Sequence, residues 1–488
     1  MKRKWSISFF IYFLIFGTNI SSLTAQTLQP VQPIQQAAQL CPCNGALSPC
    51  GQSCDVDDVP PLPASPLFLT STRSEHLSAD YWINRLPNPD EVIKTPEEME
   101  EFNQHIRAIV KDQRDVFAIE STKSGAPIKS QIELEYGAVK NRLLFDVNGD
   151  RIPQIFFQEK IHPLIQTHKI PAKIKIRWGA AVRATSVRSL PTDKVMLEEI
   201  GDVEFDQLQF TLLKLWTPVA IYHTSSDGRW YYVQATYSRG WVKAKDIAVF
   251  SSREKLRNFI KSGDILVVTG ESTPIYDAAD FSAVIQRPSM GTVLPLSRET
   301  SNAYVVWMPV RGGDGGAILE EAYVSVQSDA SVGFLPYTQR SVIRQAFKLL
   351  GARYGWGGTY GGRDCSGFTH DVFLTVGIDM PRSSQGQGFI GIQYSQFEPF
   401  EHAEAKTQFL QEALPGVTLL RMPHHQMLYL GEENGKFYVI HSTWAERISY
   451  TSDEKIRINQ VVVSDLSLNG NSRIGSLFDR IISMNELE

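Results

Sequence analysis

The hydrophobic pattern of this chain changes its period along the sequence, from helical spacing to strand alternation and then to a mixture of both. Since one core domain holds roughly 100–200 residues, a chain of 488 residues is expected to form three or four. The pattern predicts an α+β protein. Its segments are a signal peptide at 1–25, a Cys/Pro-rich linker at 26–66, a helical segment at 67–168, two small β-barrels at 169–255 and 256–335, and a mixed domain at 336–488.

The first residues have the parts of a secretory signal. Lys2 to Lys4 are basic, and residues 7–16 form an apolar core that is too short to span a membrane. Small and polar residues follow, and Ala25 is a suitable cleavage point. An uncleaved anchor is the less favoured alternative, and no cysteine stands where a lipid anchor needs one. We therefore expect an exported protein, periplasmic or on the cell surface, with no membrane span after signal removal.

Export changes how the five cysteines are interpreted. Four of them, Cys41, Cys43, Cys50 and Cys54, cluster in a stretch with few apolar residues. They predict two disulfides, and three pairings are possible. Their spacing does not match a common zinc motif. Cys365 is left as an unpaired thiol, for which chemical reactivity is a reason.

The helical segment contains a clear helix start. Thr95 is a candidate N-cap, Pro96 occupies the first turn and Glu98 can complete a capping box. Apolar residues then recur at helical spacing, at Met99, Phe102, Ile106 and Ile109. No catalytic combination of side chains stands out before residue 168.

The next two segments have the pattern of short strands. Asp227-Gly228 predicts a hairpin turn between strands at 219–224 and 230–237, the second continuing to 240–242. The segment from 263 to 326 is also rich in short apolar runs. Two such units predict small barrels, with a β-sandwich as the alternative. Direct identity between the units is weak, so an internal repeat is a hypothesis only.

Cys365 follows a glycine-rich loop and precedes apolar residues at helical spacing. This places the thiol at a helix N-terminus, where unpaired N–H groups and the helix dipole favour a thiolate. Two histidines downstream, His425 and His441, lie on predicted neighbouring antiparallel strands. A base and an orienting group are what a cysteine nucleophile requires. A structural histidine pair and a zinc site are the alternatives, but no open zinc position with a base is evident.

The segment 338–488 resembles the NlpC/P60 family of cell-wall cysteine peptidases, which share a papain-like α+β core. Five motifs occur in the family's order: Tyr354 with Trp356-Gly357-Gly358, Asp364-Cys365-Ser366-Gly367, Pro381-Arg382 with Ser384 and Gln387, His425 with Tyr429-Leu430-Gly431, and His441. The resemblance implies that Cys365 is the nucleophile, His425 the base and His441 its orienting residue. His424 stands where glycine is usual, and Val417 where many members have aspartate.

The resemblance extends upstream. Residues 177–193 and 228–250 resemble the first bacterial SH3 (SH3b) domain of multidomain members, which have a helical N-terminal segment and two SH3-like barrels. It implies cleavage of peptidoglycan stem peptides, or released muropeptides, between γ-D-glutamate and meso-diaminopimelate or lysine. The first barrel is then expected to close one end of the cleft, so that the substrate needs a free N-terminal L-alanine.

The resemblance also implies which side chains hold the substrate. Asp364, Ser366 and Ser384 are expected to bind the alanine ammonium, since it needs carboxylate and hydroxyl acceptors. Arg382 and Trp356 are further candidate contacts. A barrel tyrosine is expected to join them; Tyr237 is the first candidate, with Tyr222 and Tyr232 as alternatives.

No metal or organic cofactor is expected. The 48 basic and 53 acidic residues nearly balance, so nucleic acid is not an expected partner. Two other functions remain open: an acyltransferase on the same core, and a non-catalytic wall-binding protein. Replacement of Cys365, His425 or His441 would have favoured the second, and all three are present. The sequence does not indicate the oligomeric state or the third-position diamino acid.

Overall fold

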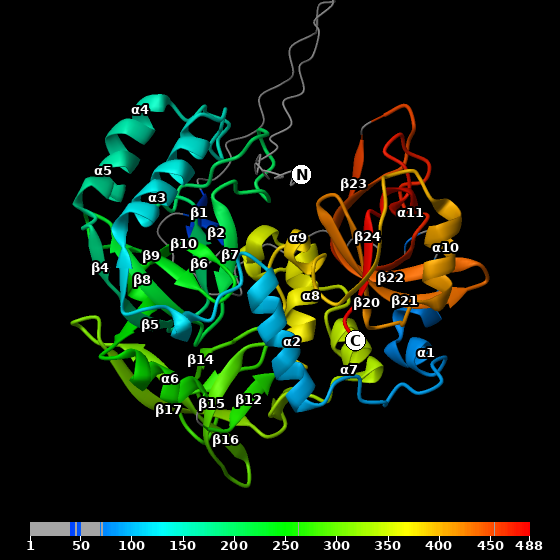
Figure 1. Cartoon of the computed structure of the whole chain (residues 1–488), viewed down its shortest axis with the longest axis horizontal. Helices are drawn as coiled ribbons and strands as arrows, with labels where there is room; N and C mark the ends of the chain where they lie inside the picture. The colour runs from blue at the N-terminus through cyan, green and yellow to red at the C-terminus, as the bar shows by residue number, and fades with distance from the viewer. Residues whose placement is uncertain (1–39, 44–45, 50–68, 70–71, 262, 453) are drawn as a thin grey trace, which may run out of the picture.

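The structure, a computed structural model, describes residues 40–43, 46–49, 69, 72–261, 263–452 and 454–488. Figure 1 shows two β units on one side, a mixed domain on the other, and helices α2, α8 and α9 between them. The chain has an α+β architecture. The predicted signal peptide, together with Cys50 and Cys54 of the predicted disulfides, lies outside the described residues. Within those residues, no helix combines the length and the apolar character needed to cross a membrane.

The helical segment is divided between the two sides of the molecule. Helix α1 (Ala79–Ile83) and α2 (Pro96–Ile109) pack on the C-terminal domain, whereas α3 (Gly125–Lys140) packs on the first β unit. The predicted capping box is confirmed: the Thr95 hydroxyl accepts from the Glu98 N–H at 3.3 Å, and the Glu98 carboxylate accepts from the Thr95 N–H at 2.8 Å. Short turns complete the segment, at α4 (Gln154–Phe156), η4 (Phe157–Ile161) and α5 (His162–Ile165).

The first β unit is a seven-stranded sheet in the order β11-β5-β8-β9-β10-β6-β7. The expected hairpin joins β8 to β9, but the strand does not continue to Val242. The chain reverses at Thr236–Ser238, and β10 then pairs antiparallel with β9, so the expectation of one long strand is wrong. The strands are β5 (Arg177–Ala181), β6 (Thr185–Arg188), β7 (Gln209–Leu213), β8 (Pro218–Thr224), β9 (Trp230–Ala235), β10 (Arg239–Lys243) and β11 (Ile247–Phe250).

Helix α6 (Arg253–Lys261) leads to the second β unit, whose strand order is β14-β13-β17-β16-β15-β12-β18. Its central hairpin, β16 with β17, pairs nine residues of each strand. The strands are β12 (Ile265–Val268), β13 (Ile275–Tyr276), β14 (Val284–Gln286), β15 (Val293–Glu299), β16 (Ala303–Arg311), β17 (Ala317–Ser325) and β18 (Ala330–Val332).

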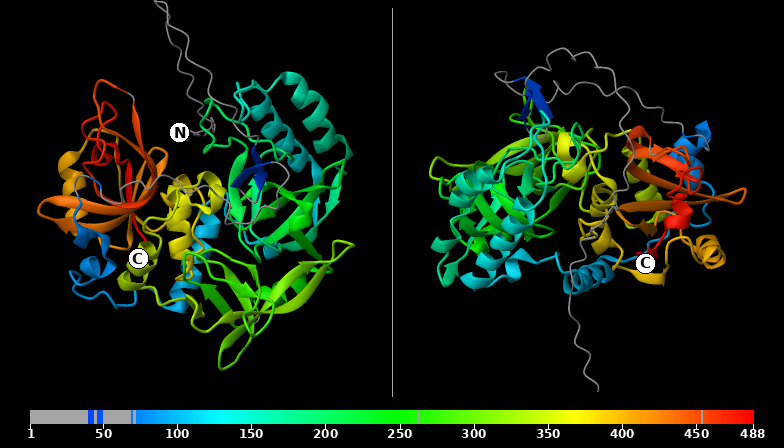
Figure 2. Two further views of the ribbon diagram at one scale, coloured as in Figure 1. Left: turned by 180° about the vertical axis from the view of Figure 1, so that it is seen from behind. Right: turned by 90° about the horizontal axis from the view of Figure 1, so that it is seen from above.

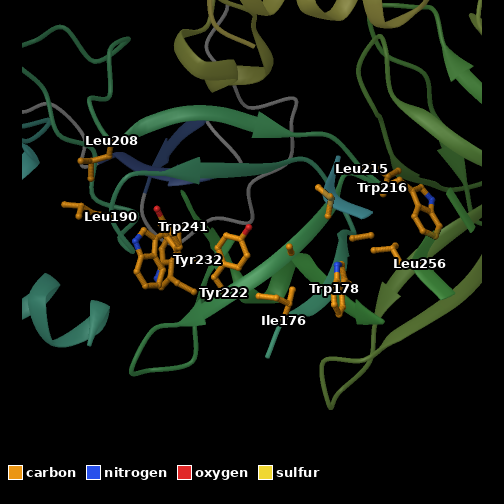
Figure 3. Packing of buried hydrophobic residues seen from close by; sticks show 14 of the residues in the cluster. Ile176, Trp178, Leu190, Leu208, Leu215, Trp216, Tyr222, Tyr232, Trp241 and Leu256 are labelled. Atoms are coloured by element: carbon orange, nitrogen blue, oxygen red, sulfur yellow. The ribbon is translucent and has the colours of Figure 1, made fainter. Parts of the chain in front are cut away.

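One apolar core continues through the helical segment and both β units. Tyr222, Tyr232 and Trp241 lie together within it, and Trp178 lies on the side of Leu215, Trp216 and Leu256 (Figure 3). Burying an aromatic side chain removes some 150–250 Å² from water, so this cluster is a main source of stability. The two β units therefore share one hydrophobic core and are not separately packed domains.

The C-terminal domain packs helices against a six-stranded antiparallel sheet in the order β19-β24-β20-β21-β22-β23. Figure 2 shows this sheet from behind and from above, with the terminal strand β24 inside it. The strands are β19 (Ile392–Gln396), β20 (Thr418–Met422), β21 (His425–Glu433), β22 (Lys436–Arg447), β23 (Lys455–Asp465) and β24 (Ser483–Glu486). The helices are α7 (Gln339–Lys348), α8 (Cys365–Leu374), α9 (Ser384–Gln387), α10 (Ala403–Glu412) and α11 (Leu477–Arg480).

Candidate active site

Cys365 is the first residue of helix α8, as its position after the glycine-rich loop predicts. Asp364 is the N-cap, and its carboxylate accepts from the Gly367 N–H at 2.7 Å. The preceding loop crosses the first β unit so closely that a Cβ on Gly357 would lie 2.7 Å from Gln209, and Gly357 has a φ of +57°. Glycine is required there for both conformation and space. The thiol is 8% exposed.

The two predicted histidines meet in a hydrogen-bonded chain. His425 Nε2 lies 2.7 Å from His441 Nδ1, and His441 Nε2 lies 3.0 Å from Ser464 Oγ on β23. If His441 donates to Ser464, its Nδ1 must accept from His425, which leaves His425 Nδ1 as the unprotonated nitrogen. That direction of donation is the one that leaves His425 with the free nitrogen that a general base needs.

Cys365 lies against the first residues of β21. Its Sγ is 3.8 Å from the carbonyl oxygen of His424, the residue before His425. Burial raises the pKa of the Cys365 thiol to about 12, and the negative charge of Asp364 acts in the same direction. Burial also lowers the pKa of His425 to about 3, with a further contribution from Arg480. These shifts favour a resting pair of neutral thiol and neutral imidazole over an ion pair.

Asp364 is fully engaged by neighbouring donors. Arg382 binds both carboxylate oxygens, at 2.9 and 2.7 Å, and the Gly357 N–H donates to one of them at 2.8 Å. Burial raises the pKa of Asp364, but the Arg382 charge and hydrogen bonds from Arg382, Gly367 and Gly357 outweigh it and hold the pKa below its usual value. Ser366 lies in the same cluster: its Oγ is 3.1 Å from Arg382 and 3.4 Å from Asp364.

Cys365 lines a cleft of about 470 Å³ built by three parts of the chain. The C-terminal domain contributes Trp356, Arg382 and Ser384, and also His424. Trp356 is 37% exposed. The helical segment contributes residues 110–114 and Glu135, and the first β unit contributes residues around β7, β9 and β10. The cleft thus brings Cys365, Asp364, Ser366, Ser384, Arg382 and Trp356 together, and Tyr237 also lines it.

The three candidate tyrosines differ in what their hydroxyls contact. The Tyr237 hydroxyl donates to the Leu212 carbonyl at 3.1 Å and accepts from the Lys214 N–H at 3.2 Å. Its donor and one acceptor position are therefore used within the protein. Tyr232 donates to Glu135 at 2.9 Å. Tyr222 is not among the residues that line the cleft. Tyr237 is therefore placed at the cleft, with its hydroxyl held by backbone.

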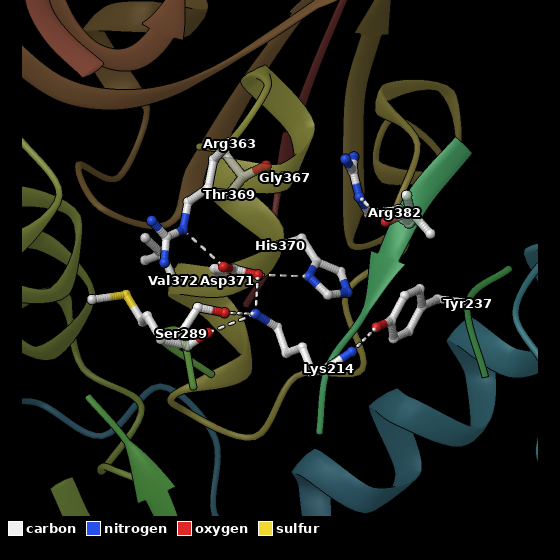
Figure 4. A network of polar contacts seen from close by, with 12 residues as sticks. Lys214, Tyr237, Ser289, Arg363, Gly367, Thr369, His370, Asp371, Val372 and Arg382 are labelled. Carbon is white, nitrogen blue, oxygen red and sulfur yellow. Dashed lines mark hydrogen bonds and ion pairs between the residues drawn. The ribbon is translucent and has the colours of Figure 1, made fainter. Parts of the chain in front are cut away.

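A buried polar network ties helix α8 to both β units (Figure 4). Asp371 lies 2.8 Å from Lys214 of the first unit and 2.8 Å from Arg363, while Lys214 also donates to Ser289 of the second unit at 2.9 Å. Burial raises the pKa of Asp371, but Lys214 and Arg363 together lower it far below its usual range. The network holds the first β unit against the helix that begins at the nucleophile.

Sequence patterns missed three residues of this site. Ser464 interrupts the apolar run of β23, and that interruption was the available signal. Glu135 and Arg239 come from the helical segment and the first β unit, and no local pattern separates them from solvated charges. Among the described residues, no group of three histidine, cysteine or acidic side chains is arranged to hold a metal ion.

Comparison with known proteins follows the same division of the chain. Residues 351–465 match the NlpC/P60 family, and residues 197–243 match the SH3 domain of SH3b1 type. A gamma-D-glutamyl-L-lysine dipeptidyl-peptidase of Bacillus cereus (strain ATCC 10987 / NRS 248) is 31% identical over 166 residues, which are 33% of this chain and 44% of that enzyme. The match therefore spans less than half of that enzyme.

Two solved structures are similar. An NlpC/P60 endopeptidase from Photobacterium damselae subsp. piscicida has a TM-score of 0.69 at 20% identity, covering 87% of this chain and 98% of that one. An NlpC/P60 family protein from Bacillus cereus ATCC 10987 has a TM-score of 0.42 at 19% identity, covering 57% and 82%. The first of these likenesses establishes a shared fold across most of the chain.

Proposed function

We propose that this chain is an exported peptidoglycan hydrolase that cuts the bond between γ-D-glutamate and the following diamino acid of stem peptides, as the match of residues 351–465 to the NlpC/P60 family suggests. The observation that carries the proposal is the His425–His441–Ser464 chain, next to a cysteine at a helix N-terminus that opens into a cleft. The gamma-D-glutamyl-L-lysine specificity of the Bacillus cereus relative supports the choice of bond.

In the first half of the reaction, His425 Nδ1 takes the thiol proton as Sγ attacks the γ-carbonyl carbon. This follows from the neutral resting pair, because the proton moves during attack and not before it. The backbone N–H groups of Cys365 and Ser366, at the start of α8, stabilise the oxyanion. The C–N bond then breaks, and the leaving amine takes the proton from His425.

In the second half, water attacks the thioester carbonyl while His425 removes a proton from the water. The C–S bond breaks, and the proton on His425 returns to Sγ. His441 accepts from His425 Nε2 throughout and keeps the ring in position, in the way that a third group orients a catalytic base. Both products leave with atoms and charge in balance.

The cleft also supports a substrate with a free N-terminus. Residues of the helical segment and the first β unit form one wall of this cleft of about 470 Å³. This volume is within the range of small-ligand sites. Asp364, Ser366, Ser384, Arg382 and Trp356 form the peptidase side of this space, and Tyr237 packs at its edge.

The test uses the purified chain without its signal peptide and the peptide L-Ala-γ-D-Glu-meso-diaminopimelate, with the lysine peptide in parallel. Mass spectrometry should detect L-Ala-D-Glu and the free diamino acid, and Cys365→Ala should release neither. Transfer of L-Ala-D-Glu to an added amine in preference to water would identify an acyltransferase. Absence of reaction with both peptides, while Cys365 still alkylates, would reject the proposed bond.

A further inference from the structure

His424 has a backbone conformation that disfavours its own residue type. Pro423 and His424 form the two-residue turn that joins β20 to β21, because Met422 pairs with His425. Proline fixes φ at about −65°, and His424 has a φ of +63°. This combination is the pattern of a type II turn, whose second central position favours glycine or asparagine. Glycine would form this turn without strain, so the turn itself does not explain the imidazole.

His424 also lies where a substrate can reach it. The residue is exposed and lines the active-site cleft together with Cys365. Its carbonyl oxygen is 3.8 Å from Cys365 Sγ, so its backbone is in contact with the nucleophile. Strained residues cluster at ligand-binding positions, where contacts with the ligand can offset the strain. The strain and the position together indicate contact between His424 and the substrate.

The proposed reaction brings the leaving group next to His424. His425 gives its proton to the leaving amine, so this nitrogen must come within hydrogen-bond distance of the His425 ring. His424 is the preceding residue, and neighbouring Cα atoms are about 3.8 Å apart. In the leaving diamino acid, one carboxyl group is bonded to the same carbon atom as this nitrogen. That carboxyl group therefore lies within reach of an imidazole at position 424.

The surroundings of the leaving group favour a negative charge. A neutral imidazole always keeps one N–H donor, and a carboxylate accepts hydrogen bonds without donating any. Arg480 on α11 adds positive charge, which contributes to the lowered pKa of His425. Burial and the charge of Arg447 lower the pKa of Arg480 itself. A carboxylate on the leaving group would thus meet both a hydrogen-bond donor and a positive field.

We propose that His424 is a specificity-determining residue whose ring N–H binds the free carboxylate of the leaving diamino acid, so that stem peptides ending at this residue are preferred. A peptide that continues with D-alanine has an amide in place of this carboxylate. A neutral amide forms a weaker hydrogen bond than a carboxylate does. The inference rests on the proposed function and deepens it, because it names the length of stem peptide that the site selects.

The first test compares three peptides. They are L-Ala-γ-D-Glu-meso-diaminopimelate, the same peptide amidated at the carboxyl group next to the scissile nitrogen, and the peptide extended by D-alanine. Wild type should cleave the first with a kcat/KM about 10-fold or more above the other two, the range for a hydrogen bond to a charged group. His424→Gly should reduce this preference to less than about threefold, by loss on the first peptide. Its Tm should not fall, since glycine suits the turn.

His402→Gly is the matched control. His402 is an exposed histidine with the same φ of +63°, at the start of α10, and it does not line the cleft. Its replacement should change kcat/KM on each peptide less than about twofold. His424→Asn is the conservative variant, since asparagine tolerates this conformation and keeps an N–H donor. It should retain more of the preference than His424→Gly does.

A binding measurement separates failure of this contact from failure of the proposed reaction. Calorimetry of Cys365→Ala should show that the free-carboxylate peptide binds about 10-fold or more tightly than the amidated one. Adding His424→Gly should remove that difference. If wild type cleaves no peptide but this result is obtained, the reaction is wrong and the His424 contact stands. A wild-type enzyme that does not distinguish the peptides, or a preference that His424→Gly leaves unchanged, would overturn the inference.

Discussion

The two ends of the cleft differ in how their charges are satisfied. At the peptidase end, Asp364 and Arg382 complete each other, and backbone N–H groups occupy what remains of the carboxylate. At the far end, Glu135 and Arg239 each keep a buried atom without a partner. A carboxylate whose oxygens are all hydrogen-bonded is held in one position, whereas a buried polar atom without a partner can still bind a ligand. Cys365 therefore lies beside the end of the cleft whose charges are paired within the protein.

The largest expected effect comes from removing the nucleophile. Cys365→Ala should lower kcat at least about 10⁴-fold, because no other group in the cleft can form the thioester. The same variant should bind L-Ala-γ-D-Glu about as well as wild type, since the substitution leaves every other side chain of the cleft in place. Peptide cleavage and calorimetry check the two statements. Loss of both together would mean that the substitution disturbs the cleft as a whole.

Removing one arginine from each end should separate their structural roles. Arg382→Gln leaves the buried Asp364 carboxylate without its countercharge and should cost about 3–5 kcal/mol of unfolding free energy. Arg239→Gln breaks no ion pair and should cost less than about 1 kcal/mol. Urea unfolding of both variants tests this contrast. Similar losses of unfolding free energy in the two variants would show that Arg239 contributes as much to stability as Arg382 does.

The pH dependence of stability should have opposite signs at the two ends. The pKa of Asp364 is lowered on folding, so its ionised form stabilises the protein above the ordinary carboxyl range, about pH 4, and this stabilisation is lost as pH falls. The pKa of Glu135 is raised, so its ionised form opposes folding at neutral pH. At pH 7, Asp364→Asn should lower Tm and Glu135→Gln should raise it.

The differences in Tm between each variant and wild type should become smaller on acidification, because the wild-type carboxyls then become neutral. Thermal melts between about pH 3 and pH 7 would follow the two variants beside wild type. A Glu135→Gln variant that melts lower than wild type at pH 7 would contradict the picture of an unsatisfied carboxylate.

The smallest expected effect is at Ser464, which acts through His441. Ser464→Ala removes one neutral hydrogen bond, worth about 0.5–1.5 kcal/mol, and should lower kcat a few-fold with KM unchanged. Ser464→Thr keeps the hydroxyl and should retain most of the activity. Steady-state kinetics of the pair separates positioning from packing. Equal losses in both variants would assign Ser464 a packing role.

The sequence predicted the residues that local patterns can place. The capping box at Thr95, Cys365 at the start of a helix and the meeting of His425 with His441 all follow from spacing along the chain. The reversal at Thr236–Ser238 was missed because these three residues include no glycine, proline, asparagine or aspartate that would signal a turn. Glu135 could not be found, since it reaches the cleft through the packing of α3 on a β unit that begins some 40 residues later.

The Asp371 network has a consequence for how such chains can be shortened or recombined. A peptidase domain excised near residue 336 would keep Asp371 and Arg363 but lose Lys214, and its helix α8 would expose a surface shaped for another domain. The far wall of its cleft would be lost as well. The C-terminal domain therefore cannot be transferred to another protein without loss of contacts. Removal of either upstream β unit would remove contacts to helix α8, which begins at Cys365.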